Sequence, residues 1–307
     1  MPTKSVYLHI GTHKTGSTSI QRFLARTDEV LAKQGILYPE AGRPDTNWST
    51  QYGQHELYWS IVGKRGIGDE QVWDNLRREM EEHPGQRVVI SAEGFEECTS
   101  DEIGRIVNHL ESHPIRIIVY LRPPLQFLRS AYAQRVKSGT CSGPFVRFVR
   151  EMTSRCNYLD LVSRWEQFDA ITSVDIRLFD KVKSSPGLEA SFADAVGIDF
   201  EEVQTFVRPP ANASPPDDLI QIARWINTLE AFGGEGKMRK ILANRARSNL
   251  FDCQWPGTWI AGVARPFVRE SLVTDRAVDV LREELRETHE RFLKKYVCSE
   301  DRKYLPL

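Results

Sequence analysis

SVYLHIGTHKTGSTSIQRFL, residues 5–24, is the stretch that decides the fold. An apolar run of strand type ends at Gly11, a loop of small and polar residues follows, and helical spacing begins near Ser17. The start of a helix presents backbone N–H groups and a partial positive charge, so such a loop suits an anion. Lys14 adds a full positive charge. The stretch therefore predicts a phosphate-type site at the end of the first strand.

The position of Lys14 separates this loop from the site that binds nucleoside triphosphates. In that site the pattern is GxxxxGK[ST], with the lysine directly after the second glycine. Here the order is Gly11-Thr-His-Lys14-Thr-Gly16-Ser-Thr, so the lysine stands two residues before the second glycine. The pattern favours an anion other than a triphosphate. A kinase of the phosphate-loop class and an ordinary helix start without a ligand stay open as alternatives.

The composition argues against several partners. Lys and Arg number 41 against 42 Asp and Glu, which leaves a net charge of −1 and no general basic field for nucleic acid. The five cysteines are odd in number and lack CxxC spacing, so neither a zinc site nor a disulfide framework is expected. The N-terminus has no apolar signal core, and the apolar runs are far shorter than the ~20 residues of a membrane span. We expect a soluble, cytoplasmic protein without membrane insertion.

Further β-branched runs predict a parallel sheet. Strands are expected at 5–10, 87–92, 115–121 and 173–179, each apolar through most of its length, as in strands buried on both faces. Helical spacing between and after them predicts helices over 17–34, 69–82, 100–112, 124–138 and 158–168. Alternating strands and helices favour an α/β fold with a parallel, P-loop-like sheet flanked by helices. The order of the strands does not follow from the pattern.

The rest of the chain divides into three regions. Residues 38–68 are rich in turn formers and aromatic residues and predict an elaborated loop inserted between the sheet elements, with a short helix near 55–62. A proline-rich connection at 205–216 leads to residues 217–296, which read as mostly helical. Their last helix is amphipathic, with Thr274 or Asp275 as its cap. We expect a single domain over 1–307.

A second anion pocket is predicted by IRIIVYLRPPLQFLRSAYAQRVKSG, residues 115–139. Arg122 stands at the carboxyl end of a buried strand, and Pro123 and Pro124 start a helix. Arg129 and Ser130 follow about two turns along that helix. Ligands of open α/β sheets bind at strand ends, so an arginine and a serine held in this way favour a second anion.

Two anion pockets in this order resemble the sulfotransferases that use 3′-phosphoadenosine-5′-phosphosulfate (PAPS), in particular the bacterial carbohydrate sulfotransferase type. THKTGSTS is similar to the family's 5′-phosphosulfate loop, and Arg122 with Ser130 is similar to its 3′-phosphate pattern. The segments 157–180 and 208–219 also resemble the family. The family's glycine-flanked basic segment near the C-terminus is missing, and Lys237, Arg239 and Arg245 are its possible substitutes.

The resemblance implies transfer of a sulfuryl group from PAPS to an acceptor hydroxyl or amine, with 3′,5′-diphosphoadenosine (PAP) as product and no required metal. Lys14 would neutralise the leaving oxygen. The residues implied in holding the donor are His13, Lys14, Thr15, Gly16, Ser17, Thr18, Ser19, Arg122 and Ser130. Backbone amides of 13–18 and the hydroxyls of Ser17 and Thr18 would bind the 5′-phosphate. A catalytically inactive nucleotide-binding protein of the same fold is a further alternative.

The catalytic base has three candidates. Glu93 ends the strand RVVIS and resembles the catalytic glutamate of glycan sulfotransferases. His55, in the 38–68 insertion, could be a base or an acceptor contact, and His13 could contact the sulfuryl oxygens. Glu96 and Glu97 are expected to be solvated.

The insertion also suggests the acceptor. Flat aromatic faces suit sugar rings, and basic residues suit acidic groups. These residues are Trp48, Tyr52, Tyr58 and Trp59, with Arg43, Lys64 and Arg65. They favour a small-molecule or glycan acceptor, with the acceptor group on a carbohydrate or glycolipid. Steroids, lipids, phenols and peptides stay open as alternatives, and Tyr58 and Trp59 also fit core aromatics.

Overall fold

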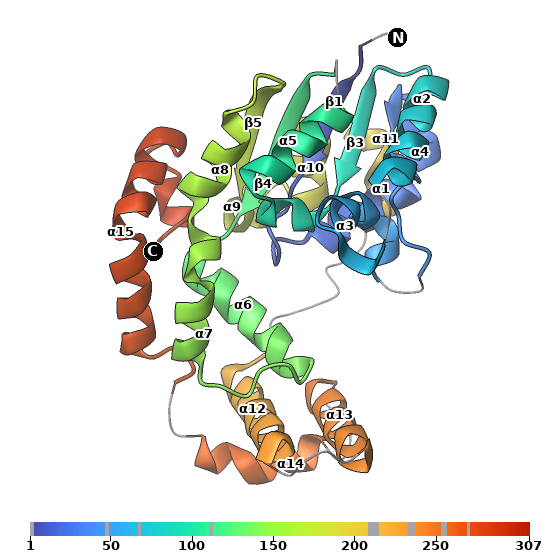
Figure 1. The fold of residues 1–307 in the computed structure, drawn as a ribbon. Helices are drawn as coiled ribbons and strands as arrows, with labels where there is room; N and C mark the ends of the chain where they lie inside the picture. Colours follow the sequence, from blue (N-terminus) through green and yellow to red (C-terminus); the bar gives the residue numbers. More distant parts are fainter. Residues whose placement is uncertain are drawn as a thin grey trace. The chain divides into compact units, whose positions relative to one another are not determined.

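The computed structural model describes residues 3–46, 49–66, 69–110, 113–207, 215–232, 237–252, 257–268 and 271–307. The chain divides into two compact units (Figure 1). The first unit comprises 1–122, 158–210 and 291–306, and the second comprises 123–157, 211–290 and Leu307. Each is described by itself, and the single domain over 1–307 stays a prediction.

The first unit holds a five-stranded parallel sheet in the order β2-β3-β1-β4-β5. The strands are β1 (Ser5–His9), β2 (Ile36–Leu37), β3 (Arg87–Ser91), β4 (Ile115–Leu121) and β5 (Ile171–Leu178). The predicted α/β class and the four predicted strands are confirmed. The sequence pattern missed β2, because two residues are too short a run to show a strand period.

Helices cover both faces of the sheet (Figure 1). The helices of the first unit are α1 (Ser17–Arg26), α2 (Asp28–Lys33), α3 (His55–Ile61), α4 (Asp69–Glu82), α5 (Ser100–His109), α8 (Tyr158–Glu166), α9 (Phe179–Ser184), α10 (Leu188–Val196) and α11 (Phe200–Val203). The single helix predicted over 17–34 is two helices. The break is at Thr27, whose hydroxyl donates to the carbonyls of Phe23 and Leu24.

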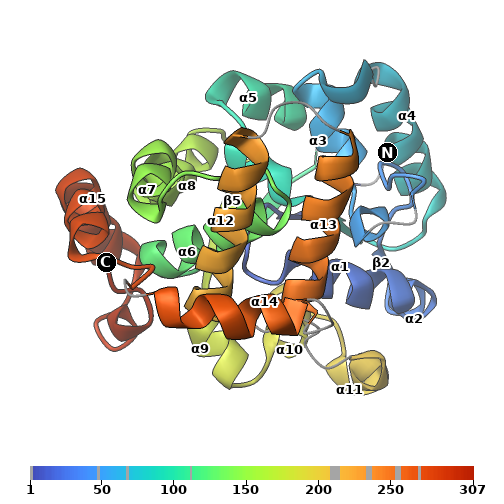
Figure 2. The ribbon, with the colours of Figure 1, turned by 90° about the horizontal axis from the view of Figure 1, so that it is seen from below.

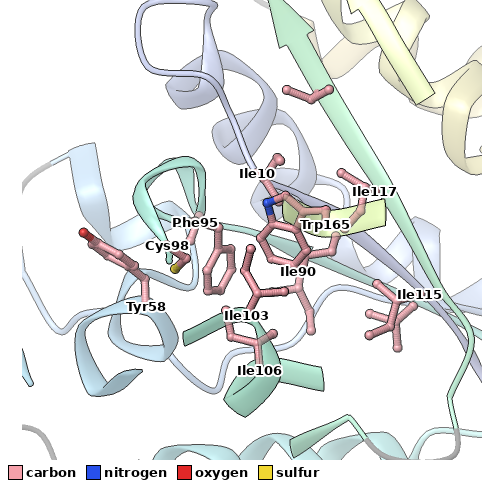
Figure 3. Close-up of a cluster of buried hydrophobic side chains, with 14 of the residues drawn as sticks. Ile10, Tyr58, Ile90, Phe95, Cys98, Ile103, Ile106, Ile115, Ile117 and Trp165 are labelled. Atoms are coloured by element: carbon pink, nitrogen blue, oxygen red, sulfur yellow. The ribbon is translucent and has the colours of Figure 1, made fainter. Parts of the chain in front are cut away.

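Alternate residues of β1, together with Ile10 directly after it, supply two separate cores. Val6, Leu8 and Ile10 pack with side chains of α3, α4, α5 and α8, whereas Tyr7 packs with α1, α2 and α10. Figure 3 shows part of the first core, where isoleucines of the strands meet Ile103 and Ile106 of α5 and Trp165 of α8. Because both faces of the central strand are buried, the loop after it is held on a rigid base.

The second unit is helical in its described residues, as expected for 217–296. Its helices are α6 (Pro124–Lys137), α7 (Phe145–Met152), α12 (Asp217–Phe232), α13 (Lys237–Phe251), α14 (Gly257–Ala264) and α15 (Asp275–Tyr296), whose last turns belong to the first unit. Helices α12 and α13 lie side by side, and α14 runs across their ends (Figure 2). Thr274 caps α15, since its hydroxyl accepts the amide of Ala277 at 3.4 Å. Residues 208–214 of the predicted 208–219 motif lie outside the described residues.

Arg247 joins three elements of the second unit. Its side chain is 3% exposed and donates to Glu230 at 2.5 Å and to Asn227 at 2.8 Å, both on α12. The amide of Asn227 in turn donates to the carbonyls of Val136 and Cys141, at 2.9 and 2.7 Å. This buried network fixes α13 against α12 and the end of α6.

Among the described helices, none combines the length and the apolar character needed to cross a bilayer.

Candidate functional site

The strand order brings three predicted site segments to one edge of the sheet. Central β1 pairs with β3 on one side and β4 on the other, and all run parallel. Their carboxyl ends therefore meet, which places the loop 11–16 between Glu93, two residues after β3, and Arg122, directly after β4. Backbone bonds tie the loop to β4, since Tyr120 donates to Gly11 and Thr12 donates to Tyr120 at 2.8 and 3.0 Å. The sheet edge is a typical ligand position.

The loop path depends on two glycines. Gly11 has φ of 105° and lies against Glu93, whose Cα would be 3.3 Å from a Cβ at position 11. Gly16 has φ of 84°, and a Cβ there would collide with Leu188 of α10. Lys14 also adopts a left-handed conformation, with φ of 66°, which costs a residue with a side chain about 1 kcal/mol. These positions turn the chain sharply from β1 into α1.

The N-terminus of α1 carries open backbone donors. The helix begins after Gly16 with no side-chain cap and no acidic residue in its first turn. In the part of the chain that the structure describes, the amides of Thr15, Gly16, Ser17 and Thr18 donate to no other group. The amide of His13 differs, since it donates to Glu96 at 2.9 Å. The predicted cradle of amides 13–18 therefore does not include residue 13.

Three hydroxyls of the predicted phosphate site are engaged within the fold. Thr15 and Ser17 both donate to the carbonyl of Thr12, at 2.6 and 3.2 Å. Ser19 donates to Glu189 of α10 at 2.6 Å. These bonds hold the loop in shape, so its amides, rather than these hydroxyls, are the donors available to an anion.

Two cations lie at the loop. Burial is the main cause that lowers the pKa of the Lys14 ammonium; Glu93 opposes this shift and Arg122 adds to it. The Arg122 guanidinium donates to the carbonyl of Lys14 at 3.4 Å and lies 5.4 Å from the ring centre of Phe179. A partly buried positive pair next to open amides defines a site for a strongly anionic group.

The three base candidates lie together. Glu93 Oε1 is 3.8 Å from His13 Nε2, and these side chains are 28% and 31% exposed. His55 begins α3 and stacks on Trp59 with 6.0 Å between ring centres. Burial lowers the pKa of His55, while the nearby Glu93 carboxylate acts in the opposite direction and His13 adds to the lowering. His55 is therefore a neutral imidazole near pH 7.

Glu96 corrects one expectation. It was predicted to be solvated, yet it is only 7% exposed, and its carboxylate accepts the amide and Nδ1 of His13. It is buried because Arg164 of α8 donates to the carbonyls of Glu96 and Cys98, which draws the 3-10 helix η3 (Glu93–Glu97) against the core. Adjacent glutamates are typical of a solvated surface, so no sequence signal marked this residue.

Glu97 is exposed, as predicted, and accepts the hydroxyl of Tyr58 at 3.1 Å. Ligand atoms of His13, Glu96 and Glu97 lie within 4.8 Å of one another, a grouping that no spacing in the sequence indicates. Hydrogen bonds between His13 and Glu96 account for their closeness, and we assign no metal to the group.

The pair Arg122 and Ser130 stays a prediction. Arg122 belongs to the first unit, whereas Ser130 lies on α6 of the second. Arg129, the neighbour of Ser130, is engaged inside the second unit, where it donates to Asp217 at 2.7 Å and to the carbonyl of Pro215 at 2.9 Å.

The acceptor-side residues divide into structural and accessible ones. Tyr58 is 6% exposed and packs in the core, and Arg43 donates to the carbonyl of Tyr38 while lying 4.4 Å from its ring centre. Trp59 and Tyr52 are half-buried, and Lys64 and Arg245 are exposed. Trp48 and the side chains of Arg65, Lys237 and Arg239 lie outside the described residues.

Comparisons with known proteins place this site in context. No model of a known protein family matches the chain. An uncharacterized protein of Archaeoglobus fulgidus is 28% identical over 142 residues, which is 46% of this chain and 38% of that relative's length. The crystal structure of a sulfotransferase from Alicyclobacillus acidocaldarius aligns with a TM-score of 0.44 and 17% identity, over 84% of this chain and 99% of that one.

Proposed function

We propose that the protein is a PAPS-dependent sulfotransferase, with PAP as its product. The observation that supports this most is the combination at one sheet edge of four open amides at the start of α1, two flanking cations, and a carboxylate. The amides and cations suit the phosphosulfate group, and the carboxylate suits the removal of a proton from an acceptor. A kinase with a displaced lysine would use the same edge, so the donor must be tested directly.

In the proposed reaction, the acceptor oxygen forms a bond to sulfur while the bond from sulfur to the bridging oxygen breaks. By analogy with phosphoryl transfer, such a step needs positioning and charge stabilisation more than covalent help. The amides of Thr15, Gly16, Ser17 and Thr18 hold the 5′-phosphate, and Lys14 neutralises the charge on the departing oxygen. Glu93 receives the proton of the acceptor hydroxyl. Arg122, with Ser130, binds the 3′-phosphate.

The acceptor we propose is a hydroxyl of a carbohydrate or glycolipid. Trp59 is half-buried and stacks on His55. The charge of Glu93 acts to raise the pKa of His55, against the larger effect of burial. An aromatic ring stacked on a histidine that lies near the proposed base suits contact with a sugar ring. His55 contacts the acceptor in this proposal.

Calorimetric titration with PAP, with and without EDTA, tests the donor. We expect metal-independent binding in the micromolar range, and at least tenfold weaker binding of ATP with magnesium. Tight, magnesium-dependent binding of ATP together with weak binding of PAP would favour the kinase alternative.

A second assay separates an enzyme from a binding protein. The protein is incubated with ³⁵S-labelled PAPS and a panel of sugars, glycolipids, phenols and steroids, and labelled products are counted. Transfer to a sugar hydroxyl supports the proposal. Tight PAP binding without any release of label, to acceptors or to water, would point to an inactive nucleotide-binding protein.

A further inference from the structure

Glu96 is bonded to His13 in two places. One carboxylate oxygen accepts the backbone N–H of His13 at 2.9 Å, and the other lies 2.7 Å from His13 Nδ1. The Glu96 side chain is 6% exposed, whereas the imidazole is 31% exposed. A buried carboxylate thus holds both the backbone and the ring of a residue in the middle of the anion loop.

The position of Glu96 is itself fixed. Arg164 donates to the carbonyls of Glu96 and Cys98, and the side chain of Phe95, the residue directly before Glu96, is fully buried in the core (Figure 3). Glu96 is therefore held in place, and its two bonds to His13 fix the position of the loop.

This contact determines where the imidazole carries its proton. An ionised carboxylate only accepts hydrogen bonds, so the atom 2.7 Å from it, Nδ1, must bear the hydrogen. In the neutral ring the lone pair then lies on Nε2. That nitrogen is 3.8 Å from Glu93 Oε1, so two proton acceptors of the site face each other.

We propose that Glu96 is a positioning residue that holds His13 with its proton on Nδ1, so that His13 Nε2 and the Glu93 carboxylate act as one proton-accepting pair. This inference rests on the proposed sulfuryl transfer. It assigns to His13 a role beyond contact with the donor, and to Glu96 a role that its burial alone would not require.

The O–H bond of the acceptor breaks and its proton passes to the Glu93–His13 pair. The acceptor oxygen forms its bond to sulfur, the bond from sulfur to the bridging oxygen breaks, and that oxygen keeps the electron pair beside Lys14. Because Nε2 shares the proton, Glu93 can stay ionised next to Lys14. A carboxylate that took the proton alone would become neutral at this position.

The tautomer is tested on the protein without any substrate. In ¹⁵N spectra of histidine-labelled protein near neutral pH, the His13 ring, assigned by its loss in His13→Gln, should show a protonated Nδ1 and an unprotonated Nε2. Glu96→Gln should shift this ring toward a mixture of tautomers. A His13 ring protonated on Nε2, or one unchanged by Glu96→Gln, would overturn the proposal. This result does not depend on what the protein catalyses.

Turnover supplies the second readout, with labelled PAPS and either the acceptor found in the screen or water. Glu96→Gln and His13→Gln should each lower kcat by about 10²-fold, while the affinity for PAP changes less than threefold. His13→Gln keeps the backbone bond to Glu96, so it serves if Glu96→Gln does not fold. Glu97→Gln, on the same 3-10 helix but bonded to Tyr58, is the matched control and should keep wild-type turnover. Wild-type kcat in both test variants, with PAP still bound, would refute the pair and leave the transferase proposal standing.

Discussion

Lys14 combines an unusual backbone conformation with a partly desolvated charge. Its φ of 66° is uncommon for a residue with a side chain, and the loop sustains it through the hydroxyl bonds of Thr15 and Ser17 to Thr12. Such strain is typical of sites where one group must be aimed accurately. At this scale the important property is position, because one ammonium and four open amides belong to five consecutive residues, 14–18.

Replacement of Lys14 should therefore affect the chemical step most. Lys14→Ala is expected to lower kcat by about 10³-fold, because it removes the charge that stabilises the departing oxygen. Arg122→Ala should instead weaken PAP binding by about tenfold or more while preserving most of kcat. Single-turnover assays and calorimetry distinguish the two effects. Equal losses of kcat in both variants would argue against the separate roles.

Glu93 provides a test of the base that does not involve donor affinity. Glu93→Gln keeps the size of the side chain but cannot take a proton, so turnover should fall by about 10²-fold or more. PAP affinity should stay within threefold of the wild type, as measured by calorimetry. A fully active Glu93→Gln protein would remove Glu93 from the mechanism.

His9 makes the stability of the sheet sensitive to acid. Burial lowers its pKa from 6.5 to about 3, and the ring is enclosed by Tyr120 and Phe192 with Nδ1 2.8 Å from the Ser91 hydroxyl. A lowered pKa means that the unfolded chain binds the proton first. Its contribution to stability is therefore complete only well above pH 6.5 and is lost progressively as the pH falls through 6.5 toward 3, to a total on the order of 5 kcal/mol.

Urea unfolding between pH 6.5 and 5 measures this contribution before most carboxylates titrate. From this group the wild type should lose about 1.1 kcal/mol of unfolding free energy per pH unit on average over this range. His9→Gln should show a flatter dependence on pH, even if it is less stable throughout. Equal slopes in the two proteins would contradict the assignment to His9.

At the scale of elements, the sequence predicts what depends on local pattern and misses what depends on packing. Long apolar runs identified β1, β3, β4 and β5, whereas β2 was too short to detect. The loop, Glu93 and Arg122 were predictable as neighbours because each follows a strand of one parallel sheet. The burial of Glu96 was not predictable, because it depends on Arg164, which lies 68 residues further along the chain.

Helix α13 offers an energetic test at this scale. Arg247→Ala leaves Glu230 partly buried without its partner and opens the bonds to Asn227, so it should cost about 3 kcal/mol of unfolding free energy. Arg245→Ala, two residues earlier and exposed, is the control and should change stability by less than about 0.5 kcal/mol. Similar thermal unfolding of the two variants would show that the network contributes little.

For the whole molecule, the decisive question is whether one nucleotide engages both units. The amides of Thr15 to Thr18 belong to the first unit and Ser130 to the second. A donor that carries a phosphosulfate at one position and a phosphate at another can engage two separate anion sites.

Hydrogen exchange measured by mass spectrometry answers this with PAP alone. Binding should slow exchange in peptides that cover residues 11–19 and also in peptides that cover 122–137. Adenosine 5′-phosphosulfate, which lacks the 3′-phosphate, should protect only the first region. Protection confined to 11–19 with PAP would separate Ser130 from the donor site.

The loop is already ordered before a ligand binds. Thr15 and Ser17 both bond to the carbonyl of Thr12, and Glu96 accepts the amide of His13. An incoming anion then spends little of its binding free energy on ordering the chain. The association rate should therefore depend on how often the anion encounters the site. Added salt should lower the association rate constant and leave the dissociation rate constant nearly unchanged.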